Sequence, residues 1–107
     1  MPKLPGFMKD KLVSAILSGG FKKREGTMKG RDHNGEWSYC LIGVLDKIEN
    51  LNLEYISDLD KALFGQDTPL DEQSLFSKLY RINDDYVDGR PLTWEEVAVR
   101  LKERDDI

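Results

Sequence analysis

The amino-acid sequence predicts a single compact α+β domain over residues 1–107, mostly helical, with four or five helices and one short β-hairpin. The chain has 107 residues, of which 39% are hydrophobic, and this is enough apolar material for one modest core. Apolar residues recur at helical spacing in several stretches of the sequence. The pair Asn34-Gly35 is a strong signal for a hairpin turn.

The first third of the chain contains the first helix and the hairpin. Apolar residues share one face between Met8 and Leu17, and the glycine pair 19–20 that follows is typical of a helix end. The arms of the hairpin are expected near residues 27–32 and 36–39.

The remaining helices follow the same reasoning. Leu41 to Ile48 keeps helical spacing and predicts a central second helix. A third helix is expected over Tyr55 to Phe64, ended by Gly65, and a fourth over Glu72 to Ile82. The last helix starts at Thr93, because Thr93-Trp94-Glu95-Glu96 fits a capping box.

Charge is distributed unevenly along the sequence. Residues 1–31 carry a net charge of +6 and residues 32–107 carry −10, which together give −4. Such an asymmetry can orient a charged partner. The acids are densest between Glu49 and Asp88, where ten residues are acidic and three are basic. They form either solvated helix faces or a surface that imitates a row of phosphates and occupies a basic groove of another protein.

If the acidic residues bind another protein, we expect them to form one face of the molecule, with an aromatic side chain as its anchor. The expected residues of this face are Glu54, Tyr55, Asp58, Asp60, Asp67, Asp71 and Glu72.

The basic N-terminal segment offers an alternative function. A cluster of cations can contact phosphates of a nucleic acid, although it can equally be a solvated loop. Few aromatic residues are interleaved with these charges, and the total charge is negative. The residues of this alternative nucleic-acid contact are Lys22, Lys23, Arg24, Lys29 and Arg31.

Cys40 is the candidate for a nucleophile. It lies near the expected start of a helix, where the helix dipole favours a thiolate, and His33 across the hairpin could act as its base. The alternative is that Cys40 is a small buried residue in a packed helix. One cysteine excludes an internal disulfide, and one cysteine with one histidine excludes the usual zinc sites. The sequence therefore predicts no bound metal and no cofactor.

A partial calcium-loop pattern runs from Asp84 to Glu95. With Gly89 at the sixth position, Asp84, Asp88 and Glu95 take the first, fifth and twelfth positions of an EF-hand loop. The third position is Tyr86 and not an oxygen ligand, so calcium affinity is expected to be poor.

The sequence also bears on location and assembly. No apolar run is long enough to span a membrane, and the N-terminus lacks the pattern of a secretory signal, so a cytoplasmic location without membrane contact is expected. Trp94 is expected in the core by its helical phase, whereas Trp37 and Tyr86 lie beside turns and are better candidates for exposure. An aromatic surface of this kind could also form a homodimer.

Four short motifs resemble a group of small proteins of tailed bacteriophages and prophages. They are Ser18-Gly19 after the first helix, Tyr-Cys-Leu-Ile-Gly-Val-Leu at 39–45, Leu-Tyr-Arg-Ile-Asn-Asp at 79–84 and Thr-Trp-Glu-Glu-Val-Ala at 93–98. The chain departs from this group at Ile42, where leucine is usual, and in its long acidic middle.

The resemblance implies a phage or prophage origin and action inside a bacterial host cell. Together with the acidic body and the lack of a catalytic set, it predicts a non-enzymatic protein that inhibits or redirects a host or defence-system protein, such as a CRISPR inhibitor. A nucleic-acid-binding accessory protein and a Cys/His thiol enzyme remain the alternatives.

Overall fold

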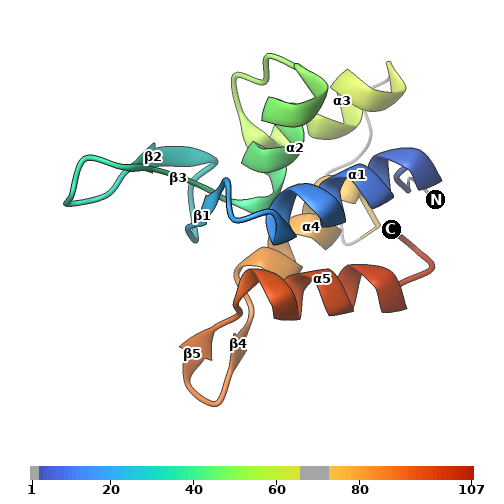
Figure 1. The fold of residues 1–107 in the computed structure, drawn as a ribbon. Coiled ribbons are helices and arrows are strands. Elements are labelled where there is room, and N and C mark those ends of the chain that lie inside the picture. The colour runs from blue at the N-terminus through green and yellow to red at the C-terminus, as the bar shows by residue number, and fades with distance from the viewer. Residues whose placement is uncertain (1–2, 66–72) are drawn as a thin grey trace.

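The computed structural model describes residues 3–65 and 73–107, and in these ranges the fold is α+β, as predicted. Helices and short strands alternate along the chain (Figure 1). The elements are α1 (Gly6–Leu17), β1 (Lys22–Lys23), β2 (Lys29–Arg31), β3 (Trp37–Tyr39), α2 (Leu41–Glu49), the 3-10 turn η1 (Ile56–Asp58), α3 (Leu59–Phe64), α4 (Leu75–Asn83), β4 (Tyr86–Val87), β5 (Arg90–Pro91) and α5 (Trp94–Glu103).

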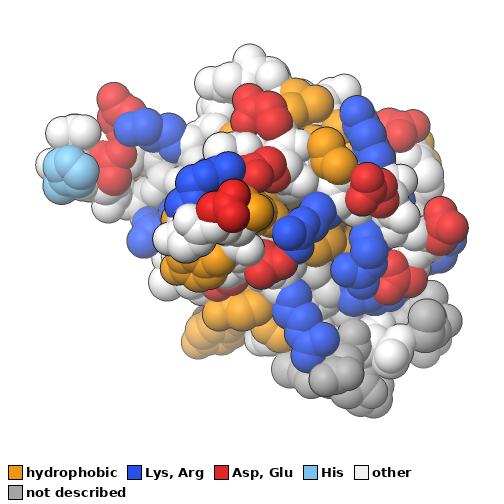
Figure 2. Space-filling model, turned by 90° about the horizontal axis from the view of Figure 1, so that it is seen from below, with side chains coloured by type: hydrophobic (Ala, Val, Ile, Leu, Met, Phe, Trp, Pro, Cys, Tyr) orange, Lys and Arg blue, Asp and Glu red, His pale blue; other side chains and the backbone are white. Residues whose placement is uncertain are grey.

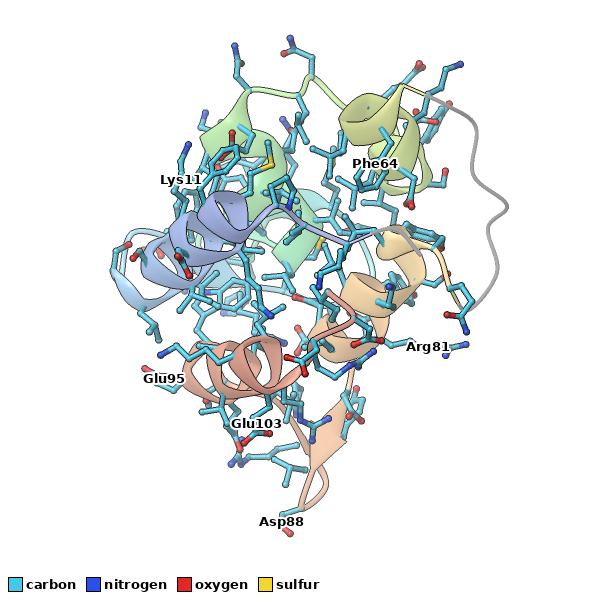
Figure 3. All side chains as sticks on the ribbon, turned by 90° about the vertical axis from the view of Figure 1, so that its right-hand side faces the viewer. Lys11, Phe64, Arg81, Asp88, Glu95 and Glu103 are labelled. Carbon is cyan, nitrogen blue, oxygen red and sulfur yellow. The ribbon has the colours of Figure 1, made fainter. Side chains whose placement is uncertain are left out.

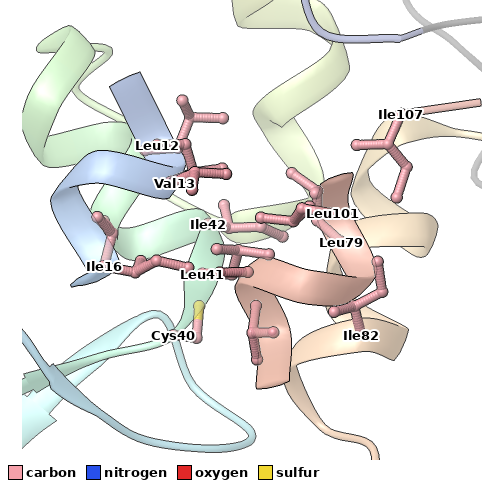
Figure 4. Packing of buried hydrophobic residues seen from close by; sticks show 14 of the residues in the cluster. Leu12, Val13, Ile16, Cys40, Leu41, Ile42, Leu79, Ile82, Leu101 and Ile107 are labelled. Atoms are coloured by element: carbon pink, nitrogen blue, oxygen red, sulfur yellow. The ribbon is translucent and has the colours of Figure 1, made fainter. Parts of the chain in front are cut away.

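Helix α2 lies at the centre of the helical body. It contacts α1 on one side and α4 on another, while α5 packs against α1 and α4. Five consecutive residues, 41–45, are buried, so this helix is apolar around most of its circumference, as a central helix must be. Most core side chains come from α1, α2, α4 and α5 (Figure 4), and Leu59 of α3 and the C-terminal residue join them. They include Leu12, Ile16, Leu41, Ile42, Leu79, Leu101 and Ile107.

The predicted hairpin is confirmed as β2 and β3, joined by a tight loop. Asp32 Oδ1 accepts hydrogen bonds from the backbone amides of Asn34 and Glu36, and Gly35 takes a φ of 80°. A left-handed glycine at the end of a three-residue loop matches the twist of the flanking strands. The hairpin reaches away from the helices (Figure 1).

Strand β1 was missed by the sequence analysis. It pairs in parallel with β3, so the sheet order is β1-β3-β2. Two lysines provide no alternation of apolar and polar residues, and each pairs with a residue 16 positions further along the chain.

One hairpin was predicted, and the structure contains a second, β4–β5, between α4 and α5. Its turn residues Asp88 and Gly89 have φ values of 53° and 77°, the left-handed pair that a two-residue hairpin turn needs. The Asp-Gly dipeptide favours a hairpin turn just as Asn-Gly does, so this second hairpin could have been predicted from the sequence.

Helix ends follow local capping with small shifts from the prediction. The third predicted helix is the turn η1 followed by α3, and Gly65 ends it at a φ of 72°, as expected. The fourth begins at Leu75 because Ser74 Oγ caps it by accepting from the Ser77 amide at 3.1 Å. The capping box at Thr93 and Glu96 is confirmed. None of the helices in the described ranges combines the length and hydropathy needed to cross a membrane.

Candidate binding surface

The structure separates the two residues of the predicted thiol site. Cys40 is the N-cap of α2, is 4% exposed, and its Sγ accepts from the Gly43 amide at 3.4 Å. Burial raises the pKa of the Cys40 thiol, with the Asp84 carboxylate adding to the rise against the lowering effect of backbone amides. His33 lies in the exposed turn beyond the opposite end of β3, roughly 13 Å of extended strand away. The predicted Cys40–His33 pair is therefore wrong.

One face of the molecule mixes charges of both signs, and the histidine lies far from the body (Figure 2). Figure 2 shows the chain's one histidine at the far end of the projecting hairpin, with acidic and basic side chains between it and the body. On the face of the body seen in this view, Lys and Arg side chains are interspersed with Asp and Glu. The segregation of charge along the sequence is therefore not repeated on this face.

The predicted acidic face is only partly present. Glu54 and Tyr55 are exposed, Tyr55 to 63%, and Asp58 is half-buried with its carboxylate accepting from the Tyr55 amide at 3.3 Å. Asp60 contradicts the prediction, because it is 1% exposed and its two oxygens each accept at 2.9 Å from the amides of Leu75 and Phe76. Its role is to tie α3 to the start of α4. The predicted residues Asp67, Asp71 and Glu72 lie outside the described residues.

Two of the predicted basic residues are engaged within the molecule. Lys22 Nζ lies 3.0 Å from Asp32 Oδ2 and 2.7 Å from Glu36 Oε2, and these hydrogen bonds raise the pKa of Lys22, the one to Glu36 most. Lys23 donates to the Asn83 carbonyl at 2.8 Å, and its side chain is 10% exposed. These contacts hold β1 to the hairpin and to α4.

Two other basic residues, Lys29 and Arg31, flank an exposed tryptophan. The register of β2 and β3 places Arg31 opposite Trp37, with Lys29 one pair further along the same face. Lys29 Nζ lies 5.9 Å and the Arg31 guanidinium carbon 5.0 Å from the centre of the Trp37 ring, which is 46% exposed. We call Lys29, Arg31 and Trp37 the hairpin platform.

The sequence analysis named all three residues of the hairpin platform but did not group them. It counted few aromatics among the basic residues because Trp37 follows Arg31 by six positions. Strand pairing removes that separation, because residues opposite each other on one face of an antiparallel pair lie about 5 Å apart. Pairing the predicted arms across a three-residue loop, 33–35, would have predicted the platform, whereas a two-residue Asn34-Gly35 turn would place Trp37 opposite Asp32.

The calcium-loop pattern does not produce a converged set of ligands. Asp84 accepts from the Gly26 amide at 3.2 Å, and Asp85 pairs with Arg100. Figure 3 shows Asp88 at the tip of the second hairpin and Glu95 apart from it on α5. Within residues 3–65 and 73–107 there is no group of three or more His, Cys, Asp or Glu side chains that could hold a metal ion.

Residues of the motifs at 39–45 and 79–84 meet around the segment that leads into the hairpin. Asn83, which is 1% exposed, accepts from the Leu41 amide at 2.8 Å and donates to the Arg24 carbonyl at 2.9 Å. The Met28 carbonyl accepts from the Cys40 amide at 2.9 Å, beside Gly43. Buried polar groups are hydrogen-bonded in folded proteins. Here those bonds join the base of the hairpin to α2 and α4.

Trp94, from the last motif, anchors the other end of the same segment. It is 9% exposed, as its helical phase predicted, and its Nε1 donates to the Phe21 carbonyl at 2.8 Å. The motifs therefore include residues that support the hairpin and residues of the core.

Comparison with known proteins identifies no relative. No family model matches the chain, and neither a curated protein nor a solved structure matches it. The resemblance to small phage proteins stays a prediction, and the function must be argued from the geometry.

Proposed function

We propose that the protein binds single-stranded nucleic acid, without catalysing a reaction on it, through the hairpin platform. The observation that supports this most is the exposed Trp37 ring on a projecting hairpin, with two cations at 5.9 and 5.0 Å from its centre. An aromatic ring offers a stacking surface to any unpaired base, and lysine and arginine attract the adjacent phosphates. Stacking of one base is worth about 1–3 kcal/mol.

The negative net charge of the chain does not argue against this site. Interactions between exposed charges are screened beyond about 8 Å at physiological ionic strength, so a nucleic acid on the hairpin responds mainly to nearby groups. The nearby carboxylates of Asp32 and Glu36 are paired with Lys22. Lys29 and Arg31 therefore dominate the field around Trp37.

A single-stranded ligand fits the platform better than a duplex. Stacking on Trp37 requires the face of an unpaired base, which a duplex conceals between its neighbours. The platform also lacks the large basic face that is typical of duplex binding at a phosphate backbone.

The test is fluorescence anisotropy with a labelled oligothymidylate at low salt. We expect Trp37→Ala to weaken binding about five- to a hundredfold, the loss of one stacked base. Lys29→Gln and Arg31→Gln should each reduce the slope of log affinity against log salt by about 0.7. Lys47→Gln, an exposed lysine in the last turn of α2, is the matched control and should change neither quantity. Equal binding by the wild type and Trp37→Ala would overturn the proposal.

A second candidate function uses the remaining part of the acidic face. Tyr55 is 63% exposed beside the exposed Glu54, and this pair is suited to anchor a basic surface of another protein. The partner implied by the phage resemblance is a host or defence-system protein, which this chain would inhibit. A pull-down from host lysate at low salt, with Tyr55→Ala as the control, tests this candidate. Recovery of the same proteins by both forms would contradict it.

A further inference from the structure

An open hollow of about 490 Å³ lies at the joint between β1, β3 and the end of β2. It opens on the face of the sheet opposite Trp37, because Gly30 and Ser38 alternate with Arg31 and Trp37 along the two strands. Four basic residues, two acidic residues and one serine line it. We call it the basic hollow. Its residues are Lys22, Lys23, Arg24, Glu25, Arg31, Asp32 and Ser38.

The acids of the basic hollow are already paired with its lysines. Asp32 lies 3.0 Å from Lys22, and Glu25 lies 3.4 Å from Lys23. Hydrogen bonds from Lys22 and from the backbone hold the pKa of Asp32 below its usual value, so this acid stays ionised and engaged. The guanidinium groups of Arg24 and Arg31 therefore supply the excess positive charge of the hollow.

Arg24 has a donor without an acceptor in the described part of the chain. Its Nε is buried and has no hydrogen-bond partner among the residues that the structure describes. A buried unsatisfied donor is costly and calls for an explanation, such as a ligand.

The position of the Arg24 guanidinium depends on the absence of a side chain at residue 30. A β-carbon on Gly30 would lie 1.8 Å from Arg24 Nη1 and 2.8 Å from its Cζ. Gly30 holds the middle of β2, where a side chain would normally stand above the sheet. The guanidinium occupies that space.

We propose that the basic hollow binds a phosphate group, and specifically a phosphate of the strand whose base stacks on Trp37. The second half of this inference rests on the proposed function. A phosphate offers several acceptor oxygens in the geometry that a guanidinium fork matches. Arg31 connects the two positions, because it lines the hollow and also contacts the Trp37 ring at 5.0 Å. A short strand that passes around the edge strand β2 would then place a base on the platform and a neighbouring phosphate in the hollow.

The first test uses inorganic phosphate alone and observes the Nε–Hε signals of the arginines by NMR. We expect a saturable shift of the Arg24 signal that chloride at equal ionic strength does not produce. In Lys22→Gln, whose exposed side chain lines the hollow, the titration midpoint should rise severalfold. No saturable shift at Arg24, or an equal shift of all arginine signals, would overturn the phosphate site.

The second test moves the guanidinium without removing its charge. Gly30→Ala should force the end of the flexible Arg24 side chain out of its position, while alanine fits the backbone of a strand. We expect this variant to bind a 5′-phosphorylated thymidine dinucleotide with a neutral methylphosphonate linkage about tenfold more weakly, and to bind the same dinucleotide without its 5′-phosphate unchanged. Gly6→Ala, where a β-carbon would meet nothing within 4 Å, is the matched control. Circular dichroism would establish that both variants keep the fold.

The outcomes separate the two proposals. If oligothymidylate binds through Trp37 but Gly30→Ala does not distinguish the two dinucleotides, the function stands and the phosphate site falls. If phosphate shifts Arg24 but no oligonucleotide binds, the hollow is an anion site and the nucleic-acid function falls, along with the second half of this inference.

Discussion

Gly43 is a residue whose missing side chain decides how two parts of the fold meet. It lies in the buried part of α2, where a missing side chain often allows another helix to come close. The group that approaches is instead a loop carbonyl, since a β-carbon on Gly43 would lie 2.1 Å from the Met28 oxygen. That oxygen accepts from the Cys40 amide, so it cannot move away without breaking a bond at the start of α2.

We expect Gly43→Ala to lower the free energy of unfolding by about 1–3 kcal/mol, the usual cost of overpacking. Alanine favours a helix over glycine by about 1 kcal/mol, and this gain offsets part of the steric cost, so the measured loss falls towards the lower end of that range. Urea denaturation measures the change. Gly6→Ala, also in a helix but with free space around its β-carbon, should be neutral or slightly stabilising. Equal effects of the two variants would contradict the steric explanation.

Asn83 is the second residue that joins separate parts of the chain. Its amide group accepts from the Leu41 amide and donates to the Arg24 carbonyl. Asn83→Ala would leave the Leu41 amide buried without a partner, at about 1–3 kcal/mol, and would remove the bond to the part-buried Arg24 carbonyl. Thermal unfolding should show a large decrease in the melting temperature. Asn34→Ala, in the exposed hairpin turn, should leave it nearly unchanged, and a comparable decrease there would contradict the assigned role.

At the scale of elements, Asp60 completes the capping of α4 that Ser74 begins. The first amides of a helix have no partner inside it, and Asp60 accepts from those of Leu75 and Phe76 across the gap between α3 and α4. Asp60→Asn keeps one acceptor and places an NH₂ group against the other amide. We expect a loss of about 1–3 kcal/mol in unfolding free energy, measured by urea denaturation. Asp10→Asn, an exposed acid in α1, is the control, and a loss of equal size there would contradict this role.

The start of α5 gives the fold a dependence on acid pH. Arg90 contacts Glu96 with two hydrogen bonds of 2.7 and 3.1 Å, and the Thr93 amide donates to Glu96 at 2.9 Å. The hydrogen bonds from Arg90, and next those from Thr93, lower the pKa of Glu96 from 4.5 to about 2. A lowered pKa stabilises the folded state above the unfolded value and is lost as the pH falls through the folded one.

The contribution of Glu96 should therefore be complete above pH 4.5 and disappear between pH 4.5 and about 2. Glu96→Gln should be less stable than the wild type at pH 6, and the difference should shrink across this window. Arg104 lowers the pKa of Asp106 to about 2, so Asp106 also affects stability over this pH range. Its contribution is the same in the wild type and in Glu96→Gln, and it cancels when the two are compared. Glu95→Gln, in the same helical turn, is the matched control. A constant difference at all pH values would contradict the assignment.

Sequence reasoning succeeded where the determinant of an element is local. The capping box at Thr93 and the left-handed Gly65 are contained within a few consecutive residues. It failed where the determinant is a contact across the chain. Asp60 has the sequence signature of a surface acid, and only the placement of α4 makes it a buried cap. For the same reason, the hairpin platform emerges only when β2 and β3 are paired.

At the scale of the whole molecule, charge along the chain is a poor guide to charge in space. The basic N-terminal segment and the acids that follow it fold onto each other, since Lys22 pairs with Asp32 and Glu36. What projects is a hairpin with one cation-flanked aromatic, held at its base by Asn83 and Trp94. Because these contacts hold the base of the hairpin in place, less entropy is lost when a ligand binds the exposed Trp37 ring.

The alkylation rate of the Cys40 thiol reports how often the whole fold opens. It lies in the core beside Leu41 and Ile16 (Figure 4), and burial raises the pKa of its thiol, so alkylation requires opening of the fold. For a domain of ordinary stability, iodoacetamide should react at least about a thousandfold more slowly than with a free thiol, and urea should accelerate the reaction in proportion to the unfolded population. An Asn34→Cys, Cys40→Ser double variant presents an exposed thiol and should react at the free rate, independent of urea. Fast, urea-independent alkylation of the wild type would show that the sulfur is accessible in the folded protein, and would return a thiol-based activity to consideration.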